Sequence, residues 1–122
     1  MTGKITEAEL REQVKVLAAK FLQRTASQIP QLQNELERLA ATGDRNALRI
    51  IQDIVHKIHG SGAMFGFDLI SERAGDLEKF TTRVPADAES TALAAVAAPM
   101  RPLLEGLASA LVAAERDSPP LS

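Results

Sequence analysis

The chain has 122 residues and a net charge of −2 at pH 7, a length that fits one compact domain. Hydrophobic residues make up 45% and charged residues 25%, the balance of a globular rather than a disordered protein. The absence of cysteine excludes disulfides, thiol catalysis and cysteine-ligated zinc. The weak negative charge and the presence of only four aromatic residues argue against nucleic-acid binding.

The N-terminal third predicts a helix that begins after Thr6. Thr6 and Glu9 have the spacing of a capping box, and Ile5 and Leu10 that of a hydrophobic staple. Apolar residues at helical spacing then form one stripe, which consists of Leu10, Val14, Leu17, Ala18 and Phe21 and resumes in Ile29, Leu32, Leu36 and Leu39. Pro30 predicts a bend or a division into two helices.

The rest of the chain reads as further helices with short connections. Gly43 is expected to cap the first helical region and Asp44 to begin the next. The expected helices run from about Arg45 to Met64, from Asp68 to about Arg83, and from about Ala88 to Arg116, with a loop at residues 84–87. Pro99 and Pro102 predict kinks in the last region.

These segments predict an all-α, antiparallel up-down four-helix bundle with an additional N-terminal helix or a helix kink. We expect a single domain over residues 1–122, with its core at about 6–116 and a flexible tail at 117–122. The first seven residues lack the apolar run of a signal peptide, and the strongly apolar stretch Leu93–Met100 is too short to span a bilayer. The expectation is a cytoplasmic monomer.

The second helix carries both histidines of the chain. On a helical wheel centred on Ile51, His56 lies at about 140° and His59 at about 80°. The apolar residues within about 60° of Ile51 are Ala47, Leu48, Ile54, Val55, Ile58 and Gly62. His56 is therefore expected to point away from the core, toward solvent or a partner, and His59 to lie at the border of the buried stripe.

Gly60 lies one turn beyond His56 on the same face of this helix. Glycine in a helix interior costs about 1 kcal/mol relative to alanine, so its presence calls for a reason. One reason is clearance for another protein's active site to approach the imidazole; the other is that the helix begins to unwind there. A neutral imidazole is a nucleophile that needs no activating base, so an accessible, rigidly held histidine suits phosphoryl acceptance.

The second helix and its flanks resemble histidine phosphotransfer (HPt) domains. That family's pattern is histidine, any residue, leucine or isoleucine, lysine, glycine, small residues and a second glycine that opens the next helix. The matching residues here are His56, Ile58, Gly60, Ser61, Gly62, Ala63 and Gly66, and further similarity extends to Ile70, Ala74, Leu77 and Glu78 and upstream from Phe21 to Asp44.

The resemblance implies that His56 accepts a phosphoryl group from a receiver-domain aspartate and passes it to another receiver. The implied partner is the receiver domain of a response regulator or hybrid histidine kinase, which would supply the Mg²⁺; no cofactor is expected in this chain. The residues expected near that contact are Arg49, Gln52, Lys57, Gly60, Ala63 and Met64.

One position departs from the family pattern. His59 stands where the family carries the lysine that is thought to neutralise the incoming phosphoryl group. The resemblance therefore implies an assisting role for His59, with Lys57 or Arg49 as further sources of positive charge. Histidine bears a charge only part of the time near neutral pH, so transfer is expected to be slower than with lysine.

Two other classes of function stay open at this point. Asp53, His56 and His59 recur every third residue, but they fan across about 120° of the helix and no third histidine exists to complete a metal site. The second class is an HPt-like adaptor bundle, which would dock on a kinase or regulator without being phosphorylated. No nucleotide-binding loop or catalytic triad indicates a self-sufficient enzyme, and whether the chain counts as an enzyme is left open.

Overall fold

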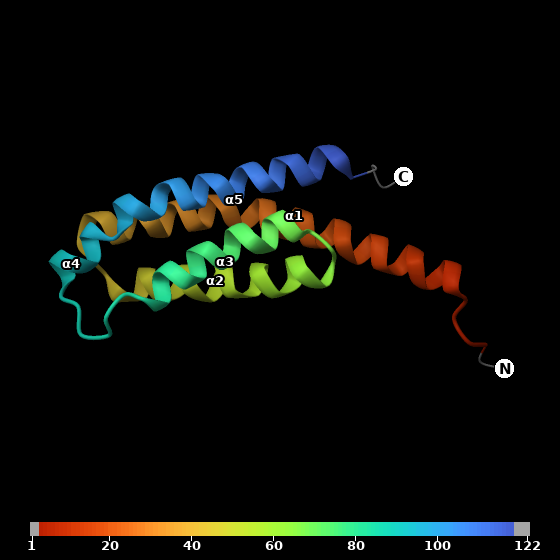
Figure 1. The fold of residues 1–122 in the computed structure, drawn as a ribbon, viewed down its shortest axis with the longest axis horizontal. Helices are drawn as coiled ribbons and strands as arrows, with labels where there is room; N and C mark the ends of the chain where they lie inside the picture. Colours follow the sequence, from red (N-terminus) through yellow and green to blue (C-terminus); the bar gives the residue numbers. More distant parts are fainter. Residues whose placement is uncertain (1–2, 119–122) are drawn as a thin grey trace.

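The computed structural model describes residues 3–118, and it contains helices and no strand over that range (Figure 1). Four long helices pack side by side, each antiparallel to the one before it, and a short helix leads into the last. Their bounds are α1 Glu7–Thr42, α2 Arg45–Met64, α3 Asp68–Thr82, α4 Ser90–Ala95 and α5 Ala97–Asp117. The predicted all-α antiparallel bundle is confirmed.

The ends of the first two helices follow the capping signals in the sequence. The Oγ1 of Thr6 accepts a hydrogen bond from the backbone N–H of Glu9 at 3.0 Å. Gly43 adopts the left-handed conformation, with φ of 64°, and its N–H donates to the carbonyl of Leu39 at 2.8 Å. The carboxylate of Asp44 accepts a hydrogen bond from the N–H of Asn46 at 2.8 Å and so caps the start of α2.

The expected division at Pro30 is absent, and the break in the last region falls just before Pro99. Pro30 does not divide the first region, because α1 continues through it for 36 residues. Leu32, two residues after this proline, is buried in the core. In the last region the break falls at Val96: Pro99 cannot donate to the carbonyl of Ala95 and its ring crowds that oxygen, so α4 ends there. α5 then runs through Pro102.

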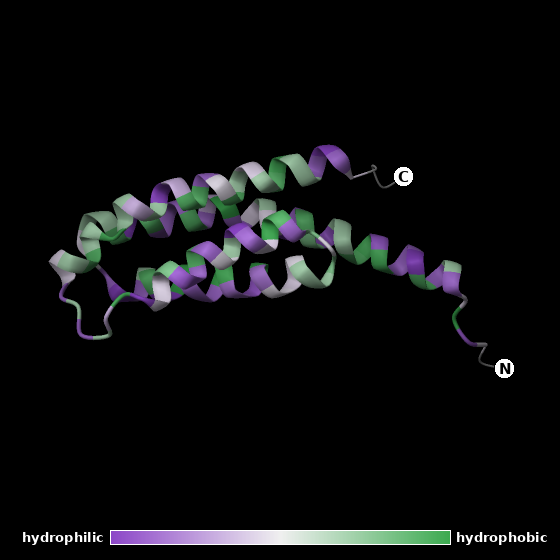
Figure 2. Ribbon diagram, viewed as in Figure 1, coloured by the Kyte–Doolittle hydropathy of each residue, from purple (hydrophilic) through white to green (hydrophobic). Residues whose placement is uncertain are grey.

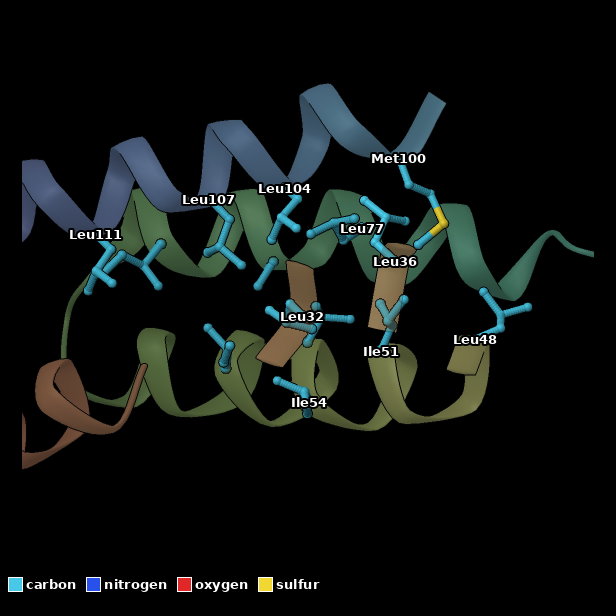
Figure 3. Packing of buried hydrophobic residues seen from close by; sticks show 14 of the residues in the cluster. Leu32, Leu36, Leu48, Ile51, Ile54, Leu77, Met100, Leu104, Leu107 and Leu111 are labelled. Atoms are coloured by element: carbon cyan, nitrogen blue, oxygen red, sulfur yellow. The ribbon is translucent and has the colours of Figure 1, made fainter. Parts of the chain in front are cut away.

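The core lies between the four long helices (Figure 3). Leucines of α1 and α5 meet isoleucines of α2 and Leu77 of α3 along the length of the bundle. The buried residues of α2 are the stripe that the wheel predicts around Ile51: Ala47, Leu48, Ile51, Ile54, Val55, Ile58 and Gly62. The rotational setting of α2, and with it the outward direction of His56, is therefore confirmed.

The apolar stripe at the start of α1 is not part of this core. Leu10, Val14 and Leu17 are each about half exposed, and the first buried residue of α1 is Phe21. This part of the helix projects beyond the end of the bundle where α2 turns into α3 (Figures 1 and 2). The stripe is uncovered because α2 and α3 do not reach that far along α1, so the buried core begins later on α1 than the expected position 6.

The C-terminal segment is strongly apolar. By length and composition alone, Ser90–Asp117 is long and apolar enough to cross a membrane, a criterion that the core helix of a soluble protein also meets. In this fold α5 directs its apolar side at α1 and α3, with buried residues Ala97, Met100, Leu104, Leu107, Ala110 and Leu111. The predicted tail lies outside the described residues from position 119 on.

Two glycines with positive φ give a test of this packing. A Cβ at Gly43 would lie 1.9 Å from the carbonyl oxygen of Ser90, whereas a Cβ at Gly66, where φ is 80°, would meet nothing within 4 Å. We expect Gly66→Ala to cost about 1 kcal/mol of unfolding free energy through backbone strain alone. Gly43→Ala should cost at least about 2 kcal/mol more, because the start of α4 at Ser90 must move. Urea unfolding measures both; equal losses would contradict the close approach of Ser90 to Gly43.

Candidate functional site

His56 stands on the outer face of α2, near the middle of the helix. Its side chain is 71% exposed, while Val55 and Ile58 on either side of it are buried. Because the buried stripe holds the helix from the opposite side, the imidazole is presented on a rigid support. A partner can reach it without any rearrangement of the core.

The imidazole of His56 is held by a carboxylate from α3. Its Nδ1 contacts Oε2 of Glu78, whose side chain is only 22% exposed. A carboxylate only accepts hydrogen bonds, so Nδ1 carries the proton and donates it to Glu78. In the neutral ring this leaves the lone pair on Nε2 free, as the atom able to act as a nucleophile.

Glu78 is a functional residue to which the sequence pattern alone gave no role. The contact could have been inferred from the residue positions, because two antiparallel helices joined by a tight turn bring together residues that are equally distant from that turn. His56 and Glu78 are both 11 positions from Phe67, which lies between α2 and α3. His59 and Gly75 are both eight positions from it, and they too are in contact.

His59 is tied to α3 by two kinds of contact. Its Nδ1 donates to the carbonyl oxygen of Ser71 at 2.8 Å, and the hydroxyl of Ser71 donates to the carbonyl of His59 at 2.8 Å. The ring lies against Gly75, where a Cβ would be 2.9 Å from Nδ1. The imidazole at the family's lysine position is thus a fixed part of the α2–α3 contact rather than a freely moving side chain.

The glycines of α2 serve two different faces. Gly60 is exposed, a Cβ there would meet nothing within 4 Å, and α2 remains helical beyond it to Met64. The alternative that Gly60 begins to unwind the helix is therefore wrong, and the open space beside His56 is real. Gly62 faces inward, where a Cβ would lie 3.2 Å from the backbone nitrogen of Ser71, and it lets α3 approach closely.

The other residues expected near a partner lie at the surface. Arg49, Lys57, Ala63 and Met64 are exposed, and Gln52 is partly exposed. Lys57 also lines a groove of about 170 Å³ between α1 and α2, together with Phe21, Arg24, Gln28, Ile58 and Ser61. Arg24, which lines this groove, was not among the residues expected near a partner.

The histidines do not converge on a metal site. Each has its Nδ1 engaged by α3, His56 with the carboxylate of Glu78 and His59 with the backbone of Ser71. Over residues 3–118, no three side chains of histidine, cysteine, aspartate or glutamate are placed to hold a metal ion together. The geometry gives the metal-binding alternative no support.

Comparison with known proteins agrees with this arrangement. The family model for the Hpt domain matches residues 16–114, which takes in most of α1, all of α2, α3 and α4, and α5 up to Ala114. No curated protein and no solved structure matches the chain. The matched range contains His56, Glu78 and Gly60 and covers most of the sequence, and on this evidence the chain belongs to the Hpt domain family.

Proposed function

We propose that this protein accepts a phosphoryl group on Nε2 of His56 from the aspartate of a receiver domain and passes it to another receiver. Membership of the Hpt family implies histidine phosphotransfer in phosphorelays. The observation that carries the assignment to His56 is the imidazole itself: exposed on its Nε2 side, with Nδ1 held by Glu78.

The transfer is a displacement at phosphorus. The Nε2 lone pair attacks the phosphoryl group of the receiver, the N–P bond forms, and the bond from phosphorus to the aspartyl oxygen breaks. The electron pair of that bond stays with the departing carboxylate. The imidazole ring gains positive charge while Nδ1 keeps its proton, and the carboxylate of Glu78 lies where it can stabilise that charge.

This chain needs to supply only a small part of the chemistry. Phosphoryl transfer depends mainly on positioning and on neutralisation of the phosphoryl oxygens, which the receiver supplies with its own metal ion and lysine. On this chain, Gly60 leaves room for that active site, and Arg24 and Lys57 offer positive charge in the groove between α1 and α2. The protein then acts as a relay intermediate, with the receiver as the catalytic partner.

Substitution of each histidine in turn tests the roles proposed for them. We expect His56→Gln to abolish phosphoryl acceptance without unfolding the bundle, because the side chain is exposed. His59→Ala should slow transfer and, by removing the hydrogen bond to Ser71, lower the free energy of unfolding by about 1 kcal/mol. His59→Lys should preserve or improve the rate of transfer. Radiolabel from phosphorylated receivers and urea unfolding give the two measurements.

Two results would contradict this assignment. Label that survives in His56→Gln and disappears in His59→Ala would mean that the two roles are reversed. Failure of the unaltered chain to take label from any phosphorylated receiver would favour the adaptor that docks without being phosphorylated.

Gly60 offers a test of the clearance beside His56. Both Gly60→Ala and Gly60→Gln should raise stability slightly, by up to about 1 kcal/mol, because alanine and glutamine are better helix formers than glycine. Only the glutamine side chain is long enough to intrude on a docked receiver. We expect Gly60→Gln to slow transfer at least about tenfold, a loss of about 1.4 kcal/mol in transition-state stabilisation, and Gly60→Ala to transfer at nearly the original rate. Unchanged kinetics in a folded Gly60→Gln variant would remove the argument.

Glu78 is expected to act through His56. Glu78→Ala removes both the acceptor for Nδ1 and the negative charge, and should slow phosphoryl acceptance by about 10- to 100-fold, as loss of an orienting partner does at metal-bound histidines. Glu78→Gln keeps an acceptor oxygen and should fall between this variant and the unaltered chain. Glu72→Ala, an exposed acid on the same helix, is the matched control. Single-turnover kinetics measure all three; equal rates in Glu78→Ala and Glu72→Ala would show that the carboxylate contact is without effect.

A further inference from the structure

The N-terminal part of α1, residues Glu7–Lys20, forms an overhang that extends past the bundle (Figure 1). The described chain exposes eight large hydrophobic residues, and five of them lie on this overhang or just before it: Ile5, Leu10, Val14, Val16 and Leu17. Figure 2 shows hydrophobic bands, in green, along this projecting part of α1, which has no neighbouring helix. The concentration of exposed apolar surface here is the largest feature that phosphotransfer at His56 does not use.

Three of these residues form a stripe. Leu10, Val14 and Leu17 follow the four-three spacing of helix pairing and fall within about 60° of one another on a wheel. The stripe leads into Phe21, which the bundle buries. A helical segment of this length gains little stability in water without tertiary packing, so an uncovered apolar stripe on it points to a partner.

The receiver that docks on His56 does not reach this stripe. In the groove between the antiparallel helices α1 and α2, Arg24 lies opposite about Ser61 and Gln28 opposite about Lys57. One residue further along, His56 is therefore at the height of about residue 29 of α1. Leu17 is then about 18 Å from His56 along the helix axis and Leu10 about 28 Å, at a rise of about 1.5 Å per residue. A standard interface covers about 800 Å² per partner, a patch of about 16 Å radius. The Hpt family match also begins only at residue 16.

The charges of the overhang favour a second copy of the same chain. Residues 7–12 carry a net charge of −2 and residues 13–20 a net charge of +2. Two overhangs side by side in antiparallel orientation bring the acidic half of each next to the basic half of the other; parallel orientation brings like charges together. An antiparallel pair is also the closed twofold arrangement that homodimers use.

We propose that the overhang of α1 pairs antiparallel with the overhang of a second copy, so that the stripes of Leu10, Val14 and Leu17 cover each other. The contact is small, which makes the dimer weak and reversible. It leaves both copies of His56 accessible, because each lies far along the bundle from the contact. This inference goes beyond the proposed phosphotransfer, and it replaces the monomer that the sequence favours.

Sedimentation equilibrium of the full chain, from about 1 μM to about 1 mM, tests the association. The chain should change from monomer to dimer over this range, and the double variant Leu10→Gln, Leu17→Gln should stay monomeric throughout. The matched control is Leu69→Gln, Val112→Gln, which removes two leucine or valine side chains of similar exposure from the bundle and should dimerise as the unaltered chain does. A monomer at every concentration, or equal loss in the control, would overturn the proposal.

Crosslinking tests the orientation, and the absence of natural cysteine makes it simple. With a short thiol crosslinker, a mixture of Glu7→Cys and Lys20→Cys chains should give mixed dimers, whereas Glu7→Cys alone should not, because its two copies are about 20 Å apart in the antiparallel pair. Efficient crosslinking of Glu7→Cys to itself would mean a parallel pair and overturn the arrangement.

Phosphoryl transfer separates this proposal from the one for His56. The Leu10→Gln, Leu17→Gln variant should accept label at the rate of the unaltered chain. Loss of transfer in that variant and not in the control would place the stripe in the receiver contact and overturn the proposed dimer. If the unaltered chain accepts no label, sedimentation and crosslinking still decide the question of pairing.

Discussion

The close pairing of α2 with α3 is the constraint on which the site depends. Phe67 lies at the turn between them, and side chains at equal distances from it meet across the pair: His56 with Glu78, and His59 with Gly75. Gly62 and Gly75 allow the approach, since a Cβ at either would meet α3 or the ring of His59 at about 3 Å. A wider spacing would leave both imidazoles without their partners.

This pairing gives two histidines on one helix different chemical situations. His56 donates from Nδ1 to a carboxylate and keeps Nε2 toward solvent, which suits a nucleophile that must bear positive charge during transfer. His59 donates from Nδ1 to a backbone carbonyl and lies against α3. The difference comes from what α3 presents at each position, and it supports the assignment of acceptor to one and of assistance to the other.

The sequence predicts what is local and misses what depends on distance along neighbouring helices. The caps at Thr6, Gly43 and Asp44 and the buried stripe of α2 are correct, because each is set by residues within a few turns. Periodicity correctly gives the direction of the apolar face at Leu10–Leu17, but it carries no information on how far α2 and α3 extend beside it. The places of Glu78 and Arg24 beside α2 follow from the register between helices, which only the distance of each residue from the connecting turn could have indicated.

The most direct test of the account is to find which nitrogen carries the phosphoryl group. NMR of the ¹⁵N-labelled chain after phosphorylation by a receiver distinguishes the two ring nitrogens of each histidine. We expect one phosphohistidine, with phosphorus on Nε2 of His56, because Glu78 holds Nδ1. Phosphorus on Nδ1 of His56, or on either nitrogen of His59, would contradict it.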